Sequence, residues 1–151
     1  MTAAVGLVQF LRARLEEDRA RALAAAPSTW HPSPEGDEVW SDDGVDDVPV
    51  CEGFALSSGQ VRATVQHVVA WQPSRVVAEV EAKAAIMAVH FRRGDDERLR
   101  MGHWWDDACD GCGYGGPCDD PLVEHVDECP VLRALAGPYR DHPGFNPAWE
   151  A

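Results

Sequence analysis

The sequence predicts an α+β fold, mostly helical and arranged as a single domain over residues 1–151. The length of 151 residues is close to the common size of one domain. Hydrophobic residues make up 45% and charged residues 26%, which is a globular composition, while 13 Gly and 11 Pro predict many loops. Three segments show helical periodicity, and the acidic stretch between the first two favours a small irregular antiparallel β element.

The first predicted element is an N-terminal amphipathic helix at residues 3–26. Val5, Val8, Leu11 and Leu15 recur at spacings of three and four residues, which places them on one face. A threonine before the segment can cap the helix, and a proline after it ends the helix. This face is therefore expected to pack against the core.

An acidic loop or β segment follows at residues 27–60. It is rich in proline and glycine, and no Lys or Arg occurs between Arg21 and Arg62. The patches STWH, DEVW and VPVCEGFAL are compatible with edge strands of a small antiparallel sheet joined by acidic turns. Their alternation is weak, which favours a solvated loop with one or two short hairpins.

A helical pair is predicted at residues 61–93, with a corner near Gln72 and the second helix beginning at Pro73. The apolar residues of that second helix are expected to face inward; they are Val76, Val77, Val80, Ala84, Ile86, Met87 and Val89. A cysteine-rich loop at residues 103–129 and a C-terminal helix and tail at residues 130–151 complete the chain.

The charge balance restricts the possible partners. With 13 basic and 26 acidic residues, the net charge is −13, so direct nucleic-acid binding is disfavoured and a basic protein partner is favoured. No stretch approaches the roughly 18–20 apolar residues of a membrane span. The first residues also lack the basic and apolar regions of a secretory signal. We therefore expect a cytoplasmic protein without membrane association.

Cysteines are concentrated in the segment CDGCGYGGPCDDPLVEHVDEC, residues 109–129, which holds four of the five in the chain. In a reducing cytoplasm, such a cluster favours metal ligation over disulfides. Cys109 and Cys112 form a Cys-x-x-Cys pair whose turn is eased by Gly111 and Gly113. The segment therefore predicts a zinc-knuckle-like loop.

A tetrahedral structural zinc site needs two further ligands. The predicted ligand set is Cys109, Cys112, Cys118 and Cys129. For one ligand, His125 and His90 are alternatives, because His125 lies four residues before Cys129 and His90 ends the long helix. Thiols without metal and a disulfide are the competing interpretations. Acidic neighbours oppose thiolate formation without a cation, so they favour the metal.

Four blocks of the chain resemble a family of short actinobacterial proteins that carry a domain of unknown function. The blocks are VQFLRARLEEDRARA, Trp30-His31, HVVAWQPSRVVAEVEAKAAIMAVH and CPVLRALAGPYRDHPGFNPAW. The resemblance implies no established activity, substrate or partner. It does imply a Cys-x-x-Cys pair before the last helix and a further cysteine just ahead of that helix, which Cys109, Cys112 and Cys129 match. Cys51 and Cys118 depart from the family pattern.

A binding role is predicted, as a small acidic zinc-stabilised interaction or accessory module rather than an enzyme. No Gly-rich phosphate loop, nucleophile elbow or paired-carboxylate motif is present, so no catalytic or cofactor-binding residue is assigned. One alternative is an acidic effector, or nucleic-acid mimic, that occupies a basic site on another protein. A second is a zinc-dependent hydrolase or deaminase using His103, Glu124 or His125. The deaminase pattern H-x-E followed by P-C-x-x-C is absent.

Overall fold

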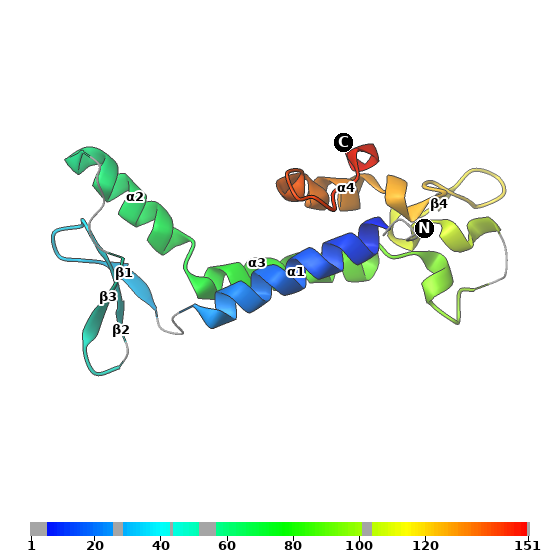
Figure 1. Cartoon of the computed structure of the whole chain (residues 1–151). Coiled ribbons are helices and arrows are strands. Elements are labelled where there is room, and N and C mark those ends of the chain that lie inside the picture. Colours follow the sequence, from blue (N-terminus) through cyan, green and yellow to red (C-terminus); the bar gives the residue numbers. More distant parts are fainter. Residues whose placement is uncertain (1–5, 26–28, 43, 52–56, 101–103, 151) are drawn as a thin grey trace. The chain divides into compact units, whose positions relative to one another are not determined.

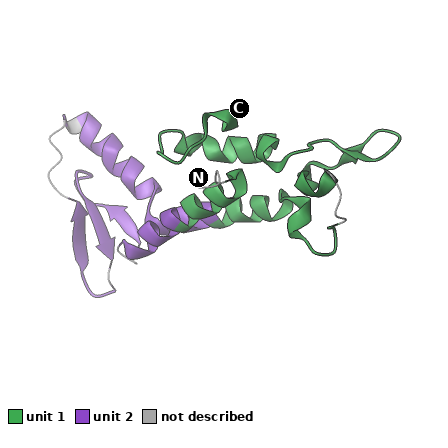
Figure 2. Cartoon of the chain, turned by 45° about the vertical axis from the view of Figure 1, so that its right-hand side comes forward, with its two compact units in different colours: residues 1–16, 81–151 green, residues 17–80 purple. Residues whose placement is uncertain are grey.

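The computed structural model describes residues 6–25, 29–42, 44–51, 57–100 and 104–150. The described chain combines α-helices with two small antiparallel sheets, which confirms the predicted α+β class (Figure 1). It divides into two compact units (Figure 2). Unit 1 comprises Met1–Glu16 and Glu81–Ala151, and unit 2 comprises Glu17–Val80. Among the described residues, no helix has both the length and the apolar character that a transmembrane helix requires.

The α-helices lie close to their predicted positions. They are α1 (Leu7–Ala24), α2 (Ser58–Ala70), α3 (Pro73–Val89) and α4 (Pro130–Ala136). The buried face of α1 includes Val8, Leu11 and Leu15, as its periodicity predicts. The predicted first residues of this helix and its last residue lie outside the described residues.

Unit 2 contains a three-stranded antiparallel sheet in the order β1-β2-β3. Its strands are β1 (Trp30–Pro32), β2 (Val39–Asp42) and β3 (Asp47–Cys51). Val39 of β2 packs with Val61 and Val65 of α2 in a buried cluster. The sheet confirms the predicted small antiparallel β element, since its three strands form two short hairpins. Strands this short give little alternation, and β3 is exposed along most of its length.

The junction between α2 and α3 lies at the predicted corner. Trp71 ends α2 with its N–H directed to the carbonyl oxygens of His67 and Val68, and α3 begins two residues later at Pro73. The side-chain oxygen of Gln72 accepts a hydrogen bond of 3.1 Å from the backbone N–H of Trp30. The corner is therefore tied to the first strand of the sheet.

The inward face predicted for α3 is only partly correct. Val80 and Met87 are buried, but Ile86 and Val89 are 40% and 57% exposed, and Ala84 is also exposed. At 100° per residue, neighbours such as 86 and 87 cannot both point along the centre of one face. The spacing of Val80 and Met87 defines the true buried side, and the β-branched residues on the other side are surface residues.

Unit 1 is built largely from short turns around the ends of α1, α3 and α4. Its small hairpin pairs β4 (Tyr114–Gly115) with β5 (Asp120–Pro121). Its 3-10 turns are η1 (Arg93–Asp95), η2 (Trp104–Asp107), η3 (Asp110–Cys112), η4 (Val126–Glu128), η5 (Gly137–Tyr139) and η6 (Pro147–Trp149). The ring of Phe10 contacts four rings of the C-terminal tail: Tyr139, His142, Phe145 and Trp149.

Candidate metal site

Three cysteines and one histidine converge in unit 1. The ligand atoms of His90, Cys109, Cys112 and Cys129 all lie within 4.8 Å of one another. The Nδ1 atom of His90 is 3.7 Å from the sulfurs of Cys109 and Cys112 and 3.6 Å from that of Cys129. The sulfurs of Cys112 and Cys129 are 3.5 Å apart. This arrangement is compatible with a metal ion bound at the centre.

Backbone hydrogen bonds bring His90 to the Cys-x-x-Cys turn. After α3 ends at Val89, Arg92 forms an antiparallel bridge with Cys109. The N–H of Asp110 donates to the carbonyl oxygen of Phe91 at 3.0 Å, and that of Arg93 donates to Ala108 at 3.0 Å. The segment after His90 is therefore held beside the cysteine turn before any side chain contributes.

Gly111 permits this close approach. A Cβ atom at this position would lie 2.4 Å from the carbonyl oxygen of Val89 and 3.0 Å from the Cα of His90. Both neighbours are backbone atoms, so a side chain would push the end of α3 away from the turn. Gly113 has a different role, since its φ of 80° lies in the left-handed region that favours glycine.

Cys129 reaches the cluster from the start of α4. Pro130 occupies the first turn of that helix, and the N–H of Arg133 donates to the carbonyl oxygen of Cys129 at 2.9 Å. Cys129 donates its own N–H to Val126 of η4 at 3.1 Å. The N–H of Cys109 bonds to Val123, upstream of η4, at 3.0 Å. These bonds link the last ligand to the first pair.

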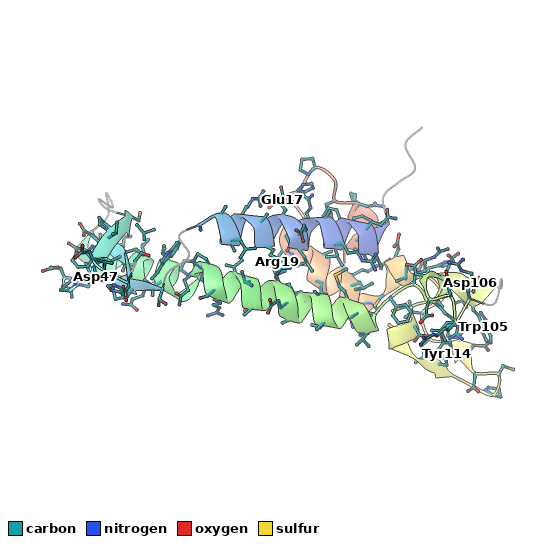
Figure 3. The ribbon with its side chains drawn as sticks, turned by 90° about the horizontal axis from the view of Figure 1, so that it is seen from below. Glu17, Arg19, Asp47, Trp105, Asp106 and Tyr114 are labelled. Atoms are coloured by element: carbon teal, nitrogen blue, oxygen red, sulfur yellow. The ribbon has the colours of Figure 1, made fainter. Side chains whose placement is uncertain are left out.

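Charged and aromatic side chains brace the cysteine turn from outside. Asp110 accepts hydrogen bonds from Arg93 at 3.1 Å and from the hydroxyl of Tyr114 at 2.9 Å. The Arg93 guanidinium also lies 5.1 Å from the centre of the Tyr114 ring. Figure 3 shows Tyr114 in this loop region with Trp105 and Asp106. The Asp110 carboxylate is therefore held by Arg93 and Tyr114, and these bonds orient the cysteine turn.

The environment of the thiols favours the neutral form when no cation is bound. Burial raises the pKa of Cys109, and the neighbouring thiols of Cys112 and Cys129 raise this pKa further. Burial and the Cys129 thiol also raise the pKa of Cys112. Bound divalent metal would reverse this preference, because the thiolate is the ligand and a metal deprotonates it.

The structure brings together some of the predicted ligands and separates others. Cys109, Cys112 and Cys129 lie together, and the fourth member of the cluster is His90, which the sequence offered as an alternative. Cys118 is exposed in the turn between β4 and β5, and His125 is exposed ahead of η4; neither belongs to the cluster. Five residues separate Cys112 from Cys118, and the β4–β5 hairpin that follows Cys112 places the Cys118 thiol outside the cluster.

The remaining candidates lie elsewhere. Cys51 is on β3 in unit 2, where it packs partly buried against the valine cluster. Glu124 is exposed, and His103 lies outside the described residues. Sequence reasoning missed the steric role of Gly111, although a glycine inside a Cys-x-x-Cys turn is a signal for close backbone approach. The role of Arg93 and Tyr114 had no comparable signal, because they come together only through the fold.

The fold and the site define a small α+β protein with a three-cysteine, one-histidine cluster compatible with a metal ion. The chain belongs to a family of unknown function, DUF6221, whose model matches residues 4–151. No curated protein and no solved structure matches the chain significantly. The predicted resemblance to a domain of unknown function is therefore confirmed at the level of the family.

Proposed function

We propose that His90, Cys109, Cys112 and Cys129 bind one structural zinc ion, and that the protein acts as a metal-stabilised binding module. The observation that supports this is the spacing of the ligand atoms. Tetrahedral zinc with bonds of about 2.3 Å to sulfur and about 2.0–2.1 Å to nitrogen separates sulfur from nitrogen by about 3.6 Å. The three Nδ1 to Sγ distances are 3.7, 3.7 and 3.6 Å.

The donor set favours zinc among the common metals. Thiolates are soft ligands that select zinc, copper(I) or iron–sulfur clusters, and an imidazole with three thiolates in a tetrahedron is a frequent structural zinc set. Calcium and magnesium prefer carboxylate and carbonyl oxygens, which this cluster does not supply. The nearby carboxylate of Asp110 is engaged by Arg93 and Tyr114.

A structural role follows from the number of protein ligands. Four side chains fill a tetrahedral coordination sphere, whereas catalytic zinc sites keep one position for water or substrate. Cys109 and Cys129 are fully buried, which limits access of a substrate to the centre. The ion would join the end of α3, the cysteine turn and the start of α4. We therefore assign a binding rather than a catalytic role.

The first experiment is elemental analysis of protein purified without a metal-affinity tag. We expect about one zinc ion per chain, with loss of most of the metal in Cys129→Ser and His90→Ala. Cys118→Ser is the matched control, because this cysteine is exposed and outside the cluster. Zinc-free protein with titratable thiols, or metal retained by His90→Ala but lost from Cys118→Ser, would contradict the proposed ligand set.

The partner that best fits this module is a basic protein surface, and the β2–β3 hairpin of unit 2 is the surface that favours it. Val45 at its turn is 86% exposed, and Val48 on β3 is 46% exposed. Asp42 and Asp47 lie at the strand ends beside these valines. Exposed apolar side chains among carboxylates suit a partner with apolar and basic groups.

Binding to such a partner is expected to fall steeply with salt, because charge pairs between exposed groups are screened. A lysine-rich and a glutamate-rich peptide of the same length and apolar content provide matched probes. We expect the lysine-rich peptide alone to bind, and Val48→Ser, which removes apolar surface without changing the charge, to weaken its binding while leaving the metal content unchanged. Equal binding of both peptides would remove the charge argument.

A further inference from the structure

A cleft of about 660 Å³ opens in unit 1, and none of the four cluster residues lines it. Its volume lies in the range of about 300–1,000 Å³ that is typical of small-molecule sites. Residues of α1, the η4 turn, α4 and the C-terminal η6 turn form its walls. The η1 turn with Arg92 before it and the η2 turn also contribute, so the cleft draws on six segments that belong to the same unit.

Some of the charged groups in the cleft neutralise one another. Arg92 forms ion pairs with Asp107 and, at 3.7 Å, with Asp95. Asp127 is also engaged, since its Oδ1 accepts a hydrogen bond of 2.9 Å from the N–H of Leu7 at the start of α1. Asp127 keeps its negative charge despite this bond, as does Glu128, which also lines the cleft.

Two other cations of the cleft form no ion pair with a side chain in the described part of the chain. Arg12 of α1 has no ion-pair or hydrogen-bond partner within the described part of the chain. Arg133 of α4 uses only its Nε, which donates to the carbonyl oxygen of Asp127 at 3.0 Å. Its terminal amino groups have no partner among the described residues. Both are notable in a chain of net charge −13, where carboxylates outnumber cations two to one.

The same cleft has an apolar side. Val8, Val126 and Trp149 line it, and all three are buried. Trp149 is fixed by the ring of Phe10, whose centre is 5.1 Å away. We propose that this cleft binds a small molecule with an oxyanion end, held by Arg12 and Arg133, and an apolar part against Val8 and Trp149. Arginine suits this task because its fork of donors matches carboxylate and phosphate oxygens.

This site is separate from the proposed zinc site, although η4 and Cys129 are adjacent in the chain. Arg12 and Arg133 are not members of the ligand cluster, so substitution of Arg12 leaves the cluster intact. The metal content of each sample therefore reports on the zinc site independently of ligand binding. Failure of one proposal can be told from failure of the other.

The test is calorimetric titration of the full, metal-loaded chain with inorganic phosphate and, separately, with succinate, at low ionic strength. We expect one site per chain for at least one probe, weakened about tenfold or more by Arg12→Ala, the loss expected for one charge-assisted hydrogen bond. Arg19→Ala is the matched control. It removes the same charge from an exposed position on the same helix (Figure 3), and Arg19 does not line the cleft.

The pattern of binding identifies the class of oxyanion. Binding of phosphate alone supports a phosphate ester as ligand, and binding of succinate alone supports a carboxylic acid, provided that Arg12→Ala weakens it and Arg19→Ala does not. Equal weakening by both variants would mean general charge attraction and would overturn the proposal. Absence of binding by both probes to metal-loaded protein would overturn it as well.

Discussion

Units 1 and 2 stabilise their irregular segments in different ways. In unit 2 the short strands pack on α2 through Val39, Val61 and Val65, which form an apolar cluster. In unit 1 the described residues between α3 and α4 form only two-residue strands and three- or four-residue 3-10 turns. Its most buried side chains include Cys109 and Cys129 themselves. The elements of this loop region are too short to bury much apolar surface. We therefore expect the proposed metal ligands, rather than an apolar core, to stabilise it.

Removal of the proposed metal ion should give the largest difference in hydrogen-exchange protection between the two units. Binding of structural zinc contributes apparent free energies of about 10–16 kcal/mol in small domains, so a strong chelator should unfold the loop region of unit 1. We expect hydrogen exchange to rise throughout residues 104–129 while α2 keeps its protection. The result is checked by mass spectrometry, with zinc restored to the same sample. Uniform loss of protection in both units would show that the contrast is wrong.

Truncation of a side chain in the apolar cluster should destabilise unit 2 and leave the proposed metal site of unit 1 unchanged. Val65 is fully buried, so Val65→Ala should lower the free energy of unfolding by roughly 2–3 kcal/mol through lost burial and a cavity. The metal stoichiometry should stay constant. Val45→Ala, at a position 86% exposed, is the control and should change stability by less than about 0.5 kcal/mol. Denaturant titration with elemental analysis tests both expectations.

Gly111→Ala should damage the cluster by steric means alone. The new Cβ would contact the Val89 carbonyl oxygen, and overpacking of this kind costs about 1–3 kcal/mol. We expect weaker metal binding in a competition titration with a chromophoric chelator. Gly137→Ala is the control, because its Cβ meets no atom within 4 Å and its φ is −50°. Unchanged metal affinity in Gly111→Ala would mean that the end of α3 can move without cost.

The smallest expected effect is a pH dependence within the sheet of unit 2. The hydrogen bond from His31 to the Pro32 carbonyl raises the pKa of His31, and a second bond to Asp47 raises this pKa further. The stabilisation is fully present below the unfolded value of 6.5 and is lost as pH rises through the higher folded pKa. NMR titration should show this pKa falling in Asp47→Asn. Asp46→Asn, which removes an adjacent charge, should change it less.

The helices could be predicted because their signals are local. The spacing of Val8, Leu11 and Leu15 and the proline at position 73 are sufficient to place α1 and the start of α3. The sheet could be predicted only as an irregular element, because three- to five-residue strands gain their stability from α2 and not from their own pattern.

The sequence predicts that the candidate site is a cysteine cluster, but it does not decide which residue is the fourth member. The Cys-x-x-Cys pair and Cys129 are visible in the sequence, and they lie in the observed cluster. The choice between Cys118 and His90 depends on which segment lies against the Cys-x-x-Cys turn. The bridge between Arg92 and Cys109 and the space at Gly111 place the segment of His90 there. These are contacts between distant segments, so no local spacing encodes them.

The hydrogen bond from Leu7 to Asp127 joins residues 120 positions apart, and it implies an order of folding during synthesis. The start of α1 leaves the ribosome early but must wait for Asp127 before this contact can form. Unit 2 is one continuous segment, whereas unit 1 is assembled from both ends of the chain. Since contacts between distant residues form slowly, we expect the sheet to be complete while unit 1 is still open, with capture of the proposed metal ion among the last steps.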